Sequence, residues 1–265
     1  MDKTNQFALM IEALAELAQE EQILIASEPL QTPPEPELPT LKSVLTDIAP
    51  LPQEALFLGI AEDGLPVLLN LYDPVPGPIL IAGDQGSGKT KFLKTIARAA
   101  DMLHAPSQVQ YGIITSRLDE WKTIHGSRNN AGVYETSDDN AKELLQSLVT
   151  WAHHNKGQEQ SILLLIDDLD AVLKLGQQAQ QNLRWLLLRG TSRRVWTFVA
   201  MDAAQAHDLK GWLEFFHTRL FGNVQHSATA NLLTGNYNLH HLKAGMQFAM
   251  REDGKLLGFW LPTIE

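Results

Sequence analysis

The stretch that decides the fold is Gly83-Asp84-Gln85-Gly86-Ser87-Gly88-Lys89-Thr90. It fills every fixed position of the pattern G-x-x-x-x-G-K-[ST]. An apolar run at residues 79–82 precedes it and a helical stretch begins near Lys89, which is the strand–loop–helix context that a phosphate-binding loop requires. The alternative is a glycine-rich turn before an ordinary helix. Motif and context together favour triphosphate binding.

The residue types in this loop each suit one part of a nucleotide. The glycines let successive backbone N–H groups converge on phosphate oxygens, and the helix N-terminus adds the positive end of its dipole. We expect Lys89 to neutralise the β- and γ-phosphates and Thr90 to give its hydroxyl oxygen to Mg²⁺. The predicted cofactors are thus ATP and Mg²⁺, contacted by residues 83–90 and by the adjacent Lys91.

A second motif supplies the carboxylates that such a site needs. The apolar run at residues 162–166 ends in Asp167 and Asp168. In P-loop enzymes the first acid after such a strand holds Mg²⁺, so we expect Asp167 in the metal shell. Asp168 is the candidate general base that polarises the attacking water. The alternative is that Asp168, with Asp170, only caps the next helix.

Short β-rich runs alternate with helical stretches from residue 55 onward. This alternation predicts an α/β fold of the P-loop, RecA-like type, with a mainly parallel sheet and helices on both faces. The predicted hairpins, at both ends of this region, are 55–60 with 66–71 and 247–251 with 256–261. The predicted core strands are 78–82, 109–115, 161–166, 195–201 and 219–224, and the predicted helices are 89–103, 138–155, 177–190 and 227–234.

The N-terminal part has a different character. Apolar residues at helical spacing between acidic ones predict an amphipathic helix over residues 5–26, within a segment 1–27. Five prolines between residues 29 and 39 end it, so residues 28–54 are predicted to be a proline-rich linker with a short helix, and residues 55–265 the ATPase domain. The helix either packs on its own domain or a second copy, or binds a protein partner.

Composition excludes several classes of function. The 265 residues include no cysteine, which rules out disulfides, thiolate catalysis and cysteine-ligated metal centres. No apolar run approaches the roughly 18 residues of a membrane-spanning helix, and no secretory signal is visible, so we expect a cytoplasmic protein without membrane insertion. Of the net charge of −10, residues 1–60 carry −8, from 10 acids and 2 bases. The acidity of the whole chain therefore does not argue against a polyanionic partner for the rest.

Residues 55–262 resemble the FtsK/HerA-type ATPases. The matches, in chain order, include Leu58-Gly59-Ile60, Ile113-Ile114-Thr115-Ser116-Arg117 with Glu120, Thr218-Arg219-Leu220 and Gly245-Met246-Gln247-Phe248. The chain departs from the family pattern at two places. Asp202 replaces the usual polar glutamine after the fourth core strand, and the paired acids Asp167-Asp168 look more like those in ATPase modules of type VII secretion motors.

The resemblance implies how the protein would act. Members of this family work as rings, commonly hexamers, in which an arginine of one subunit reaches the γ-phosphate bound by its neighbour. Arg189 and Arg219 are our candidates for that trans role, and the alternative is that both are ordinary surface residues.

Three functions stay open at this point. The leading one is a ring ATPase that moves a polymer, most plausibly double-stranded DNA. The second is a nucleotide-gated scaffold with little turnover. It is favoured by Asp168, at a position where glutamate is commoner in hydrolases of this kind, and by the replacement at Asp202. The third is a protein-translocation module of the type VII secretion kind.

Overall fold

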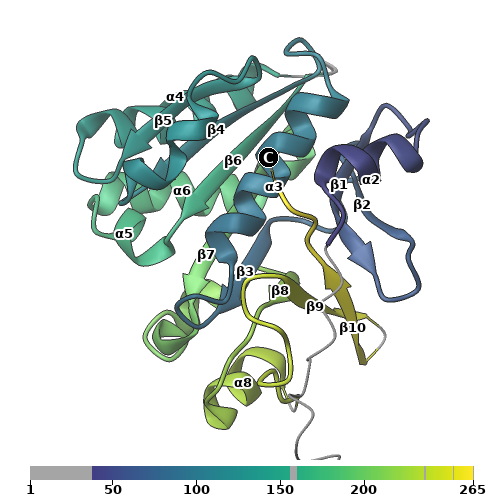
Figure 1. Cartoon of the computed structure of the whole chain (residues 1–265). Coiled ribbons are helices and arrows are strands. Elements are labelled where there is room, and N and C mark those ends of the chain that lie inside the picture. The colour runs from purple at the N-terminus through teal and green to yellow at the C-terminus, as the bar shows by residue number, and fades with distance from the viewer. Residues whose placement is uncertain (1–37, 156–159, 236, 253, 265) are drawn as a thin grey trace, which may run out of the picture. The chain divides into compact units, whose positions relative to one another are not determined.

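The computed structural model describes residues 38–155, 160–235, 237–252 and 254–264 (Figure 1). The predicted helix at residues 5–26 lies outside this range, as does the linker up to residue 37. The remainder of the predicted linker holds the short helix α2 (Leu41–Asp47), whose first turn is capped by Thr40 Oγ1 accepting a hydrogen bond from Ser43 N at 3.2 Å. None of the described helices has the length and apolar character needed to cross a membrane.

The strands in the described part of the chain form one ten-stranded sheet, in the order β2-β1-β10-β9-β8-β3-β7-β6-β4-β5. Its strands are β1 (Ala55–Ala61), β2 (Pro66–Asn70), β3 (Ile79–Gly83), β4 (Val109–Thr115), β5 (Asn130–Glu135), β6 (Ser161–Asp167), β7 (Val195–Asp202), β8 (Thr218–Phe221), β9 (Gln247–Glu252) and β10 (Lys255–Trp260).

The pairing confirms the predicted fold class and refines it. Strands β8, β3, β7, β6, β4 and β5 pair in parallel, as the alternating pattern predicts. The two predicted hairpins join the same sheet by antiparallel pairing and extend it from β8 through β9, β10 and β1 to β2. Strand β5 was not predicted, because its sequence Asn-Ala-Gly-Val-Tyr-Glu has only a short apolar stretch and contains a glycine.

Helices cover both faces of the parallel part. The α-helices after α2 are α3 (Lys89–Leu103), α4 (Asp139–His154), α5 (Leu169–Leu173), α6 (Gln177–Arg189), α7 (Lys210–Leu213) and α8 (Ser227–Thr234). Side chains alternate between the faces along each strand. On β6, Leu163 and Leu165 pack with the residues of α3, whereas Leu164 and Ile166 pack with α4, α5 and α6. Figure 1 shows α3 crossing the sheet on one face.

The strand order determines where polar residues meet. Strands β3, β7, β6 and β4 are neighbours and run in the same direction, so their carboxyl ends lie together at one edge of the sheet. The phosphate-binding loop follows β3 there, Asp167 ends β6 and Asp202 ends β7. The 3₁₀ helix η1 (Leu118–Ile124) follows β4 at the same edge. Ligands of open parallel sheets bind in this kind of position.

Candidate functional site

The glycine-rich loop has backbone conformations that favour glycine. Gly86 has φ +78° and Gly88 has φ +99°, both in the left-handed region that side chains with a Cβ atom rarely adopt. A Cβ atom on Gly88 would also lie 2.8 Å from the Cα atom of Gly245. Gly245 donates its N–H to the carbonyl oxygen of Ser87 at 3.0 Å. Gly245 therefore helps to shape the loop, a role that the sequence did not indicate because the two residues are far apart along the chain.

Lys89 lies folded back onto this loop. Its Nζ donates hydrogen bonds to the carbonyl oxygens of Gly83 and Asp84, each at 2.8 Å. Burial lowers the pKa of the Lys89 ammonium from its ordinary value, and the surrounding carboxylates, first that of Asp202, oppose the shift. The ammonium is thus held at the mouth of the loop by neutral carbonyls that it can exchange for stronger anionic acceptors.

Thr90 and Asp167 meet although 77 positions separate them. Thr90 Oγ1 donates to the Asp167 carboxylate, at 3.0 Å from Oδ1 and 3.2 Å from Oδ2. Asp167 is only 2% exposed at the end of β6. A hydroxyl and a carboxylate side by side are oxygen ligands of the kind that Mg²⁺ takes in nucleotide sites. The two residues predicted for the metal are therefore placed together.

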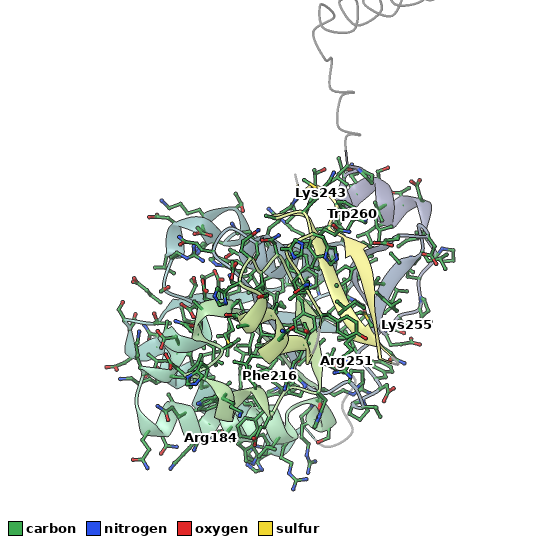
Figure 2. All side chains as sticks on the ribbon, turned by 90° about the horizontal axis from the view of Figure 1, so that it is seen from below. Arg184, Phe216, Lys243, Arg251, Lys255 and Trp260 are labelled. Atoms are coloured by element: carbon green, nitrogen blue, oxygen red, sulfur yellow. The ribbon has the colours of Figure 1, made fainter. Side chains whose placement is uncertain are left out.

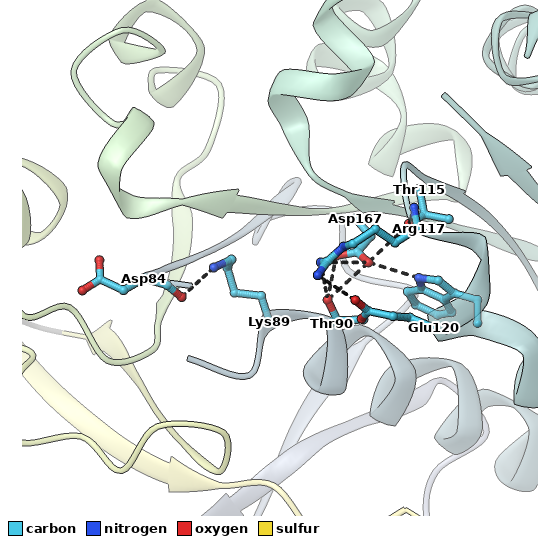
Figure 3. A network of polar contacts seen from close by, with 8 residues as sticks. Asp84, Lys89, Thr90, Thr115, Arg117, Glu120 and Asp167 are labelled. Carbon is cyan, nitrogen blue, oxygen red and sulfur yellow. Dashed lines mark hydrogen bonds and ion pairs between the residues drawn. The ribbon is translucent and has the colours of Figure 1, made fainter. Parts of the chain in front are cut away.

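Further side chains surround the Asp167 carboxylate, and sequence reasoning gave them no role (Figure 3). The buried Trp121 donates its indole N–H to Oδ2 at 3.1 Å, and Thr115 Oγ1 lies 3.4 Å from the same oxygen. Nη2 of Arg117 lies 3.8 Å from Oδ2 and donates to Thr90 Oγ1 at 3.1 Å. Arg117 also forms an ion pair with Glu120 at 2.6 Å. The order of polar residues after β4 was visible in the sequence, but their convergence on Asp167 depends on the turn of η1.

Asp168 lies at the start of α5. Its Oδ1 accepts a hydrogen bond from Asp170 N at 3.1 Å, which is the helix-capping contact of the alternative interpretation. Its backbone has φ +103°, a strained conformation for a residue with a side chain. Burial raises the pKa of the Asp168 carboxyl, and its capping bond to Asp170 N opposes the rise. The carboxylate also lines the cleft described below, so its role as a general base stays a prediction.

Asp202 occupies the end of β7, where the resemblance places a polar glutamine. Its Oδ1 accepts the N–H of Ala204 at 2.9 Å and so caps the short helix η3 (Ala203–Gln205). Asp202 lines the cleft with Asp167 and Asp168, so three carboxylates face the loop of Lys89. An aspartate cannot donate the hydrogen bond that a glutamine amide offers to a water or a phosphate unless it is protonated.

The two candidate trans arginines differ sharply in their surroundings. Arg219 is half-buried on β8 and donates to three backbone carbonyls, of Phe216 at 3.0 Å, Leu233 at 3.3 Å and Leu213 at 2.7 Å. Burial lowers the pKa of its guanidinium. A reach to a neighbouring subunit would require all three bonds to break. Arg189 is exposed at the end of α6.

The other loop residues predicted to contact nucleotide are held by neighbouring segments. Asp84 Oδ2 accepts the N–H of Gln225 at 2.8 Å, and Asp84 N donates to the carbonyl of Asn223 at 2.9 Å. Ser87 is buried beneath the loop, whereas Gln85 and Gly86 are exposed on it. Burial lowers the pKa of Lys91 in the first turn of α3.

The loop and the carboxylates border one cleft of about 440 Å³. Its lining comprises Gln85, Gly86, Gly88, Lys89, Thr90, Lys91, Ser116, Arg117, Glu120, Asp167, Asp168, Ala200, Met201 and Asp202. The first N–H groups of α3 have no acceptor within their own helix and point toward the loop. Their positive dipole end, the Lys89 ammonium and the oxygen pair of Thr90 and Asp167 fit a triphosphate with Mg²⁺.

Comparison with known proteins agrees with this geometry at the level of the fold. No protein-family model matches the sequence, and no curated protein matches it. Among solved structures, the cytoplasmic domain of the type VII secretion ATPase EccC from Thermomonospora curvata is similar, with a TM-score of 0.65 and 19% identity over 86% of this chain and 28% of that one. EssC (ATPases 2 and 3) from Geobacillus thermodenitrificans gives 0.64 and 14% identity over 86% and 47%.

A third similar structure is the pCW3 conjugation coupling protein TcpA with ATPγS, with a TM-score of 0.63 and 14% identity over 84% of this chain and 68% of that one. These likenesses show that the chain shares the fold of these proteins, which is the P-loop, RecA-like α/β fold that the sequence predicts. This chain spans between a quarter and a half of the length of the EccC and EssC chains.

Proposed function

We propose that this chain binds ATP with Mg²⁺ in the cleft beside the phosphate-binding loop and hydrolyses it as the ATPase module of a polymer-moving machine. The observation that carries the proposal is the convergence of Lys89, Thr90 and Asp167 from two separated motifs on one edge of the sheet. The alternative, a glycine-rich turn before an ordinary helix, gives no reason for the buried Asp167 carboxylate to contact Thr90, the second residue of α3.

The chain's own residues divide the work between binding and reaction. The loop N–H groups and Lys89 bind the phosphates, and the lysine moves from two carbonyl acceptors to anionic ones. Thr90 and Asp167 would hold Mg²⁺, which when bound would supply positive charge beside the phosphates. Asp168, which lines the cleft, orients the attacking water.

Calorimetric titration with ATPγS and Mg²⁺ tests the binding step. We expect saturable binding to the wild-type protein and an affinity about 30- to 150-fold lower in Lys89→Ala. An assay of phosphate release from ATP tests hydrolysis separately. Absence of binding in the wild type would refute the assignment of the loop.

We further propose that the module works as a ring closed by nucleotide, because the fold is shared with FtsK/HerA-type ATPases. Of the two candidates for the trans arginine, the exposed Arg189 is the better one, since Arg219 is bonded within its own subunit. Light scattering should show a larger mass with saturating ATPγS than without it. A monomeric mass at high protein concentration with ATPγS would contradict the ring.

Duplex DNA is the polymer we propose first. Figure 2 labels Lys243, Arg251 and Lys255, three exposed cations on or next to the β9–β10 hairpin. In the basic stretch 184–219, Arg184 stacks on Trp212 at 4.8 Å, just as Lys243 lies over Trp260 at 5.6 Å. Arg194 likewise lies over Tyr72 at 3.9 Å. DNA binding that weakens steeply with salt would support this choice, because phosphate contacts release counterions.

A specific observation favours a second candidate, a nucleotide-gated module with slow turnover. Asp168 is engaged as a helix cap, and Asp202 stands where the resemblance implies a glutamine. Both replacements weaken the positioning of water rather than the binding of nucleotide. Tight binding of ATP together with turnover that polymers do not stimulate would select this function. Stimulation of turnover by a polypeptide but not by DNA would select a protein-translocation module instead.

A further inference from the structure

Thr90 Oγ1 is shared between two partners that have opposite charges. It donates its single proton to Asp167 Oδ1 at 3.0 Å and accepts a hydrogen bond from Arg117 Nη2 at 3.1 Å. The same Nη2 lies 3.8 Å from Asp167 Oδ2. A guanidinium nitrogen therefore lies against both oxygen groups that are predicted to hold Mg²⁺ (Figure 3).

We propose that Arg117 is a built-in cation that competes with Mg²⁺ for Thr90 and Asp167, and that Glu120 holds it in that position. The inference rests on the proposed nucleotide site. A guanidinium and a dication on the same hydroxyl oxygen repel each other strongly at short distance, so one excludes the other. Arg117 must therefore leave Thr90 when Mg²⁺·ATP enters. As a result, the metal raises the affinity for nucleotide by a smaller factor than it would without the arginine.

The surroundings of Arg117 allow both positions. Its side chain lines the cleft and is 53% exposed, so it can rotate away without disturbing the core. Glu120, on the same turn of η1, pairs with Nη1 at 2.6 Å and leaves Nη2 directed at Thr90. This planar fork can engage a carboxylate and a hydroxyl at once. Asp167 keeps its bonds to Trp121 and Thr115 when Arg117 leaves.

The experiment measures metal coupling rather than activity. The affinity for ATPγS is determined by calorimetry with Mn²⁺, a spectroscopically visible substitute for Mg²⁺, and again with EDTA. The ratio of the two affinities is the metal coupling. We expect Arg117→Gln to raise this ratio about tenfold over wild type, which corresponds to about 1.4 kcal/mol. Electron paramagnetic resonance of bound Mn²⁺ gives an independent measure.

The control is Lys122→Gln. Lys122 lies on η1, which begins directly after Arg117, and it pairs with Asp119 at 2.5 Å and is 73% exposed. Its substitution removes the same charge from the same segment without a contact to Thr90 or Asp167, and we expect the metal coupling to stay within twofold of wild type. A coupling in Arg117→Gln that also stays within twofold would overturn the proposal. A wild type that binds no ATPγS would refute the nucleotide site itself, so the two failures are distinguishable.

Glu120→Gln distinguishes competition for the metal ligands from simple repulsion between the Arg117 charge and the metal. In the Arg117→Gln background the lost negative charge can only weaken the metal. In the wild-type background the same substitution also frees Arg117 from its anchor, which favours the metal. Competition thus predicts a different effect of Glu120→Gln in the two backgrounds. The factor by which it lowers the metal coupling should be at least three times smaller in wild type than in Arg117→Gln. Independent sites would give a double variant whose change in metal coupling equals the product of the two single changes. Agreement with that product within about twofold would overturn the proposal.

Discussion

The replacement of Lys89 by alanine is the most direct test of the phosphate-binding loop. The lysine makes two hydrogen bonds to the carbonyls of Gly83 and Asp84, each at 2.8 Å. On nucleotide binding these are exchanged for bonds to phosphate oxygens. The binding free energy gained from Lys89 is the difference between its bonds to phosphate and its bonds to the two carbonyls. It is therefore smaller than the free energy of the phosphate contacts alone.

The magnitude follows from that exchange. A hydrogen bond to a charged group contributes about 1.5–3 kcal/mol, and here the donor is already charged before nucleotide arrives. Two charged–charged contacts that replace two charged–neutral ones give a net gain of about 2–3 kcal/mol, since fully charged pairs are roughly twice as strong. We therefore expect Lys89→Ala to weaken ATPγS binding by about 30- to 150-fold.

The assay is calorimetry with ATPγS and Mg²⁺, and thermal unfolding checks that the fold is kept. Lys94→Ala is the matched control, because Lys94 lies five residues further along the same helix and sits over the Trp121 ring at 5.7 Å. It should change the affinity less than threefold. An affinity within threefold of wild type in a folded Lys89→Ala variant would refute the reasoning.

Three further predictions concern Asp168, Arg219 and the pH dependence of Lys89. Asp168→Asn, which keeps a side chain suited to capping α5, should slow hydrolysis at least about 100-fold while ATPγS affinity stays within threefold; equal phosphate release would show that Asp168 is only a cap. Arg219→Ala should lower the free energy of unfolding by about 2–4 kcal/mol in urea titrations, because three carbonyls lose their donor; unchanged stability with reduced turnover would instead favour the trans role. Burial lowers the pKa of Lys89, so its charge is complete below that pKa and is lost as pH rises through it. ATPγS affinity should decline at a lower pH than an ordinary lysine would cause, and a pH series in which Lys89→Arg declines at the same pH would exclude this origin.

The sequence predicted most of the fold because its signals are local. The phosphate-binding loop, the apolar strand before Asp167 and the turn at Gly64 each depend on a few adjacent residues, and the structure has the corresponding elements within one to three residues of the expected bounds. Strand β5 and helix α5 escaped prediction for the opposite reason. Each is short, and β5 exists because its backbone pairs in parallel with β4, which no pattern within residues 130–135 records.

The site was predictable only where a motif carries it. Lys89, Thr90 and Asp167 follow from residue type and spacing, and the structure places them together. Trp121 and Gly245 could not be found in this way, since an aromatic residue in a short polar helix and a glycine in a turn have many ordinary explanations. Their contacts with Asp167 and Ser87 arise from tertiary packing between segments that the sequence does not connect.

The donors around Asp167 explain why η1 belongs to the site. A carboxylate that is 2% exposed must be matched by hydrogen bonds, because an unpaired buried charge is strongly destabilising. Trp121 and Thr115 supply two of them, on Oδ2, from positions that the core fixes. Thr90 Oγ1 contacts both oxygens, at 3.0 Å from Oδ1 and 3.2 Å from Oδ2. The indole and the Thr115 hydroxyl thus hold the carboxylate independently of Thr90, so it stays in place whichever cation lies against the Thr90 hydroxyl.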